Sequence, residues 1–109
     1  MRKRYLTIIK NDTGLKEYDT GIEESENITT HELKDSEFES LCEAGILKKI
    51  NEASGLLIDD YESELIKKED VERIFSDKQF ETQIKNISLM FYKALNDLNG
   101  NIVAVALDF

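Results

Sequence analysis

The chain has 109 residues, and its 23 acidic side chains outnumber its 14 lysines and arginines, so the formal net charge is −9. A surface of that sign repels nucleic acid and anionic membranes and attracts cationic partners over a Debye length of roughly 10 Å. No stretch approaches the roughly 20 apolar residues that span a bilayer. Composition therefore argues against nucleic-acid and membrane partners and favours a protein that binds a basic protein.

The length is typical of one domain and is sufficient to bury a core without disulfides or metal. Cys42 is the only cysteine, so no disulfide can form within the chain, which is typical of a reducing compartment. The apolar run behind the basic N-terminal residues, 5–9, is too short for the core of a signal peptide. We expect one cytoplasmic domain spanning residues 1–109.

The first third of the chain predicts two strands and a loop. Residues 5–9 are β-branched, aromatic or aliphatic, and they end at the turn-forming cluster 11–14. Residues 15–22 predict a returning strand, because their apolar side chains are interleaved with polar ones, although the alternation is imperfect. The polar stretch 23–30 predicts a loop, and we expect His31 in a surface loop as well.

Three helices are predicted after this loop, over residues 35–53, 68–76 and 77–99. In the first, apolar side chains recur at steps of three and four and should form one buried stripe: Phe38, Leu41, Cys42, Ile46, Ile50 and Ala53. Gly45 interrupts this pattern, since glycine inside a helix costs about 1 kcal/mol relative to alanine. The third helix has the most regular stripe, with Phe91 near its middle.

Two further apolar segments predict strands. Residues 56–58 form a short buried strand or an extended link, and residues 102–107 are almost continuously apolar, as in a strand covered on both faces. We expect the segment 102–107 to pair with the segment 5–9, because both need neighbours for their backbone groups. The predicted fold class is α+β, with about three helices packed on a small sheet that includes the N- and C-terminal strands.

The sequence offers no catalytic constellation. His31 is the only histidine, no glycine-flanked nucleophile is present, and Cys42 belongs to an apolar stripe, where a thiol behaves as a small hydrophobe. Glycine-rich phosphate loops and paired cysteine motifs are absent. We therefore expect a protein that is not an enzyme and that uses no cofactor.

Four carboxylates surround Tyr61 in the sequence and form a candidate region: Asp59, Asp60, Glu62 and Glu64. Clustered carboxylates hold magnesium or calcium in many proteins, but the spacing here lacks the EF-hand order, so we expect no metal site. An aromatic residue flanked by acids also suits contact with a basic partner, because the ring supplies rigid apolar area and the acids meet lysine or arginine. A plain solvated turn is the remaining interpretation.

Acidic residues are concentrated in the first half of the chain, where residues 11–46 hold eleven acids against Lys16 and Lys34. Glu23, Glu24 and Glu26 lie in this block and are further candidates for partner contact. The alternative is that these acids form an ordinary solvated surface.

The second half of the chain has a run at residues 50–66, with Ser-Gly-Leu-Leu-Ile-Asp-Asp-Tyr-Glu at 54–62, followed by a short helix, a long amphipathic helix and a last strand ending in Asp108 and Phe109. This arrangement resembles the small immunity proteins that accompany bacterial polymorphic toxins, including those of contact-dependent growth inhibition. It implies a cytoplasmic protein that neutralises one cognate toxin, often a basic nuclease, by occluding its cleft. Two alternatives remain: a phage- or plasmid-encoded nucleic-acid mimic, and a metal-dependent hydrolase using Asp59, Asp60 and Glu62.

Overall fold

The computed structural model describes residues 3–22, 25–55 and 63–108. Within these residues the fold is α+β, with four strands and six helices. In chain order the elements are β1 (Arg4–Ile9), α1 (Asp12–Asp19), β2 (Ile28–Leu33), α2 (Asp35–Glu43), α3 (Ile46–Ser54), β3 (Ser63–Lys67), α4 (Lys68–Ile74), α5 (Lys78–Ile87), α6 (Leu89–Asp97) and β4 (Ala104–Asp108). The prediction of about three helices is therefore wrong in number.

The strands form one antiparallel sheet in the order β2-β1-β4-β3. The predicted pairing of the segments 5–9 and 102–107 is confirmed, because β1 and β4 are neighbours at the centre, with Thr7 opposite Ala106. On its other side Thr7 lies opposite Thr30 of β2. Residues 104–107 of β4 are fully buried, which explains why this strand is apolar at every position rather than at alternate ones.

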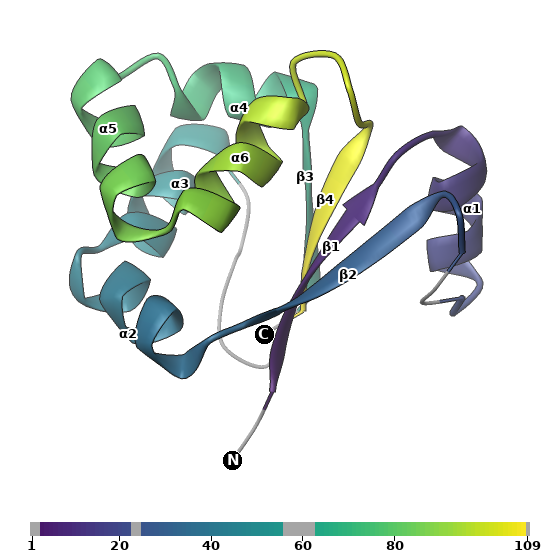
Figure 1. The fold of residues 1–109 in the computed structure, drawn as a ribbon. Coiled ribbons are helices and arrows are strands. Elements are labelled where there is room, and N and C mark those ends of the chain that lie inside the picture. The colour runs from purple at the N-terminus through teal and green to yellow at the C-terminus, as the bar shows by residue number, and fades with distance from the viewer. Residues whose placement is uncertain (1–2, 23–24, 56–62, 109) are drawn as a thin grey trace.

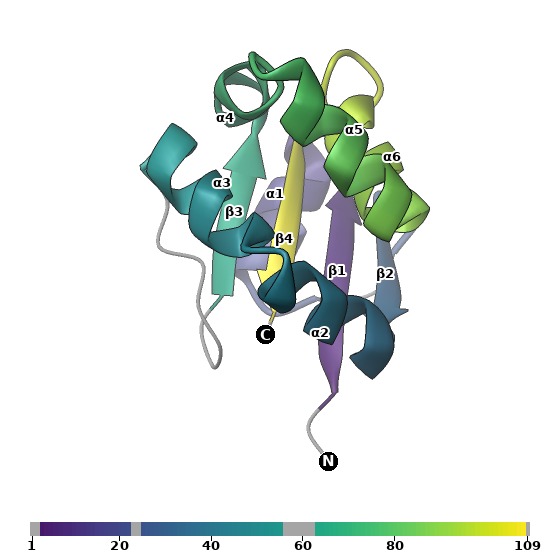
Figure 2. The same cartoon turned by 90° about the vertical axis from the view of Figure 1, so that its left-hand side faces the viewer.

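Helices cover the two faces of the sheet unequally. Figures 1 and 2 show α2 to α6 together on one face and α1 alone on the opposite face. Leu6, Val105 and Leu107 pack under the five helices in the main core, whereas Ile9 and Ala104 belong to a smaller cluster with Leu15 and Tyr18 of α1. Since α1 has only eight residues, part of this second face is left open.

The region predicted as a returning strand, 15–22, is instead largely helical. Asn11 is the N-cap of α1, and its side-chain oxygen accepts the backbone N–H of Gly14 at 2.8 Å. Leu15 and Tyr18 are three positions apart and therefore share the helix face that packs on the sheet. The returning strand is β2, which takes up part of the predicted loop and carries His31, an exposed strand residue rather than a loop residue.

Two of the predicted helices are each divided in two. The segment 35–53 breaks at Gly45, whose φ of +71° is left-handed and cannot continue a right-handed helix. The segment 77–99 breaks at Ser88, whose backbone is extended and whose side chain caps α6 by accepting the N–H of Phe91. The helix predicted over 68–76 is confirmed as α4, whereas the predicted strand 56–58 lies outside the described residues.

The predicted burial of Cys42 is wrong, because this side chain is exposed. The break at Gly45 is the reason. Without a continuous helix, Cys42 and Ile46 no longer stand one above the other on one face. In α2 only Phe38 and Leu41 are buried, so the apolar contact of this helix is one narrow line.

Candidate functional site

A network of hydrogen bonds centred on Asn27 ties α1 to the sheet. The Asn27 carbonyl accepts the backbone N–H of Lys10 at 2.9 Å, and its side-chain oxygen accepts the amide of Asn11 at 2.8 Å. The side-chain amide of Asn27 donates to Glu17 of α1 at 2.8 Å. Gly14 packs so closely that an added Cβ would stand 2.7 Å from the Asn27 carbonyl oxygen. The segment before α1, the helix itself and the turn before β2 are therefore held together at Asn27.

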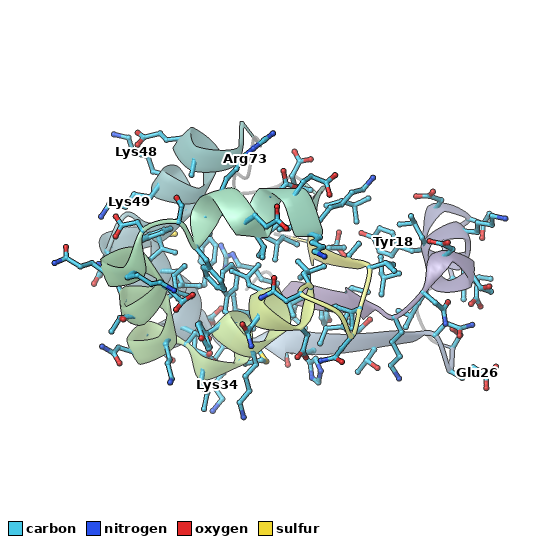
Figure 3. All side chains as sticks on the ribbon, turned by 90° about the horizontal axis from the view of Figure 1, so that it is seen from above. Tyr18, Glu26, Lys34, Lys48, Lys49 and Arg73 are labelled. Carbon is cyan, nitrogen blue, oxygen red and sulfur yellow. The ribbon has the colours of Figure 1, made fainter. Side chains whose placement is uncertain are left out.

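A cleft of about 670 Å³ lies between α1 and the face of the sheet that it leaves open. The strands contribute Tyr5, Thr7, Thr30 and Asp108, while α1 and the turn after it contribute Tyr18, Asp19, Gly21 and Ile22. Figure 3 shows Tyr18 between the sheet and α1. The volume of the cleft is in the range of clefts that bind ligands or side chains.

Hydrogen bonds hold the walls of the cleft together. The Tyr18 hydroxyl donates to the carboxylate of Asp108, with distances of 3.0 and 3.2 Å to its two oxygens. On the floor, the hydroxyls of Thr7 and Thr30 are 3.4 Å apart on neighbouring strands. Ile22 is 44 % exposed at the rim and adds apolar surface there. The cleft thus combines aromatic, hydroxyl and carboxylate groups with an exposed apolar rim.

The electrostatic character of the cleft is acidic. Asp19 and Asp108 line it, and none of its described lining residues is basic. It is built largely by the chain segment 11–33, which contains seven acidic residues and one lysine. Figure 3 shows Glu26 at the end of the molecule far from Lys48 and Lys49, so the acidic segment and these lysines of α3 are separated in space. Glu26 and these two lysines therefore lie at opposite ends of the molecule.

Most of the predicted contact residues cannot be compared with the structure. Asp59, Asp60, Tyr61, Glu62, Glu23 and Glu24 lie outside the described residues. Glu26 is exposed in the turn before β2, and Glu64 is half-buried on β3. Since β2 and β3 are opposite edges of the sheet, these two acids are not brought together. Glu64 also lies opposite Leu107, on the face covered by helices, and so faces away from the cleft.

The residues that form the cleft were missed by the sequence reasoning. Tyr5, Thr7 and Ile9 alternate along β1, and this alternation was a signal that one face of the strand differs from the other. No local signal connects Tyr18 with Asp108, because the two residues are 90 positions apart.

The described residues contain no group of three or more histidine, cysteine or acidic side chains arranged to hold a metal ion. None of the described helices combines the length and the apolar character needed to cross a bilayer. Comparison of the chain with protein-family models, curated proteins and solved structures finds no match to any of them.

Proposed function

We propose that this chain is a non-enzymatic binding protein that neutralises a basic toxin protein, in the manner of the immunity proteins that the second half of its sequence resembles. The observation that carries the proposal is the acidic cleft on the face of the sheet opposite the helical layer. This face has aromatic and carboxylate groups on a rigid sheet, which is the composition of surfaces that anchor basic side chains. The mechanism is occlusion of the toxin's cationic cleft, in which carboxylates of this chain take the place of the substrate phosphates.

The charge of the chain supports rapid capture. A net charge of −9 on a small domain biases the diffusional encounter with a positively charged protein. The association rate constant should therefore fall as salt rises, because charges more than a Debye length apart become screened. Stopped-flow measurements at low and high salt test this, and a rate constant that does not depend on salt would remove the electrostatic argument.

Co-expression with the product of the gene directly upstream tests the function itself. We expect that product to stop bacterial growth and this chain to restore it through a complex that is isolated at equal stoichiometry. Growth inhibition that this chain does not relieve would contradict the proposal. So would a partner that is a DNA-binding regulator, because that result would favour a nucleic-acid mimic.

Charge reversal locates the contact surface. One variant carries Asp19→Lys in the cleft and Glu26→Lys in the turn before β2, and a second carries Asp60→Lys and Glu62→Lys in the region around Tyr61. A matched control, Glu52→Lys with Glu72→Lys, makes the same change of net charge at exposed positions on α3 and α4. We expect neutralisation to be lost in one of the first two variants and kept in the control. Equal effects in all three would show that net charge alone acts, with no localised site.

A further inference from the structure

We propose that the cleft holds an arginine side chain of the partner protein, with the guanidinium among Tyr5, Tyr18, Asp19 and Asp108. This inference rests on the proposed function in one respect, namely that the occupant belongs to a basic protein. It deepens that function by naming the residue type that is captured and the groups that capture it.

The charge of the lining selects a cation. Two carboxylates and no described basic side chain line the cleft. Asp19 is exposed at the end of α1 and forms no ion pair within the described part of the chain, so its charge is available to an incoming group. The charge of the nearby Glu32, opposite Tyr5, is partly compensated by Lys3, whose ammonium is 3.8 Å away. A cation in the cleft would therefore meet an uncompensated carboxylate at the rim.

The aromatic walls favour arginine over lysine. Tyr5 comes from the sheet and Tyr18 from the helix, so each wall of the cleft supplies one ring. A guanidinium is planar and weakly hydrated, and it stacks on aromatic rings while donating hydrogen bonds in its own plane. The hydroxyls of Thr7 and Thr30 add acceptors on the floor. A lysine ammonium is a compact, strongly hydrated charge that makes less use of such flat surfaces.

Asp108 is held in place before any ligand arrives. The Tyr18 hydroxyl donates to both of its oxygens, which fixes the carboxylate relative to α1. Tyr18 is itself fixed by packing of α1 on the sheet and by the hydrogen bond between Asn27 and the neighbouring Glu17. Preorganisation of this kind lowers the entropy lost on binding.

A nuclear magnetic resonance titration with N-acetyl-arginine methylamide tests the proposal on the isolated protein. We expect saturable shifts of the backbone amides of Thr7, Gly21 and Ile22, with a dissociation constant in the millimolar range. The neutral isostere N-acetyl-citrulline methylamide should cause none of these shifts. Equal responses to the two probes, or no saturable response to arginine, would overturn the proposal.

Two isosteric variants test the carboxylates. Asp108→Asn keeps an oxygen that accepts the Tyr18 hydrogen bond, and Asp19→Asn keeps the exposed side chain of α1. We expect Asp108→Asn to weaken binding of the arginine probe about tenfold, and Asp19→Asn to weaken it by less. Glu52→Gln removes one charge from exposed α3 and should change the affinity by less than about twofold. Thermal unfolding of each variant confirms that the fold is retained, and equal affinity of wild type and Asp108→Asn would overturn the assignment.

The same variants in the co-expression assay separate the two proposals. If wild type and Asp108→Asn neutralise the toxin equally, the cleft inference fails while the proposed function stands. If the arginine probe binds as expected but the upstream product is neither toxic nor bound, the proposed function fails. Micromolar affinity for the isolated arginine derivative would identify a free cationic ligand as the occupant and would overturn its assignment to a partner protein.

Discussion

The hydroxyl of Tyr18 donates a hydrogen bond to the carboxylate of Asp108, at 3.0 and 3.2 Å from its two oxygens, and thereby joins the first helix to the last strand of the fold. The contact spans 90 positions of sequence. It fixes the end of α1 against the sheet and closes one wall of the cleft. The stability of the open face and the shape of the candidate site therefore depend on the same pair.

Replacing Tyr18 by phenylalanine should lower the free energy of unfolding by about 1.5–3 kcal/mol, because the ring is kept and one hydrogen bond to a carboxylate is lost. Urea denaturation measures this difference. Tyr92→Phe is the matched control, since the Tyr92 ring stacks on Phe75 and its hydroxyl has no hydrogen bond to the described residues. A loss of equal size in both variants would argue against a specific role for the bond between Tyr18 and Asp108.

Gly14→Ala should destabilise the protein by about 1–3 kcal/mol, because the added Cβ would overlap the carbonyl oxygen of Asn27. The effect should outweigh the gain of roughly 1 kcal/mol that alanine brings to a helix. Thermal and urea unfolding test this, with Gly100→Ala as the control, where an added Cβ meets no heavy atom within 4 Å. If Gly14→Ala were the more stable protein, the close packing of α1 on this turn would be wrong.

Ser88→Ala should cost about 1–3 kcal/mol, since the hydroxyl has two functions. It accepts the N–H of Phe91 at 3.2 Å and donates to Glu37 at 2.6 Å. Its removal therefore takes a hydrogen-bond partner from the N-terminus of α6 and another from the part-buried carboxylate of Glu37. Hydrogen exchange at the Phe91 amide should accelerate. Ser40→Ala, at an exposed helix position, should change stability by less than about 0.5 kcal/mol.

Phe91→Ala tests the main core. The Phe91 side chain of α6 is fully buried in the main core, and its removal leaves a cavity that costs on the order of 3–5 kcal/mol. This is a large part of the stability of a small domain. Leu89→Ala, on the same helix and 50 % exposed, should stay within about 1 kcal/mol of wild type. Similar unfolding midpoints for the two variants would contradict the packing of α6.

The sequence alone was sufficient to predict strand pairing where a segment is continuously apolar. The segments 5–9 and 102–107 are apolar at nearly every position, and such segments need neighbours on both sides, so their pairing followed without knowledge of the rest. The helix α4 and the burial of Phe91 followed equally from spacing at three and four positions. The acidity of residues 11–46 was also plain.

Only the tertiary structure decided where α1, the helix breaks and the cleft would lie. Leu15 and Tyr18 fit a helix or an imperfect strand, and the helix formed because the sheet offered a face on which both pack. At the break between α5 and α6, the hydroxyl of Ser88 donates to Glu37, 51 positions away, a contact that no local pattern indicates. The cleft joins side chains from β1, α1, β2 and β4, which no local pattern connects. Local preferences amount to about 1 kcal/mol or less per residue, so burial and hydrogen bonds between distant segments outweigh them.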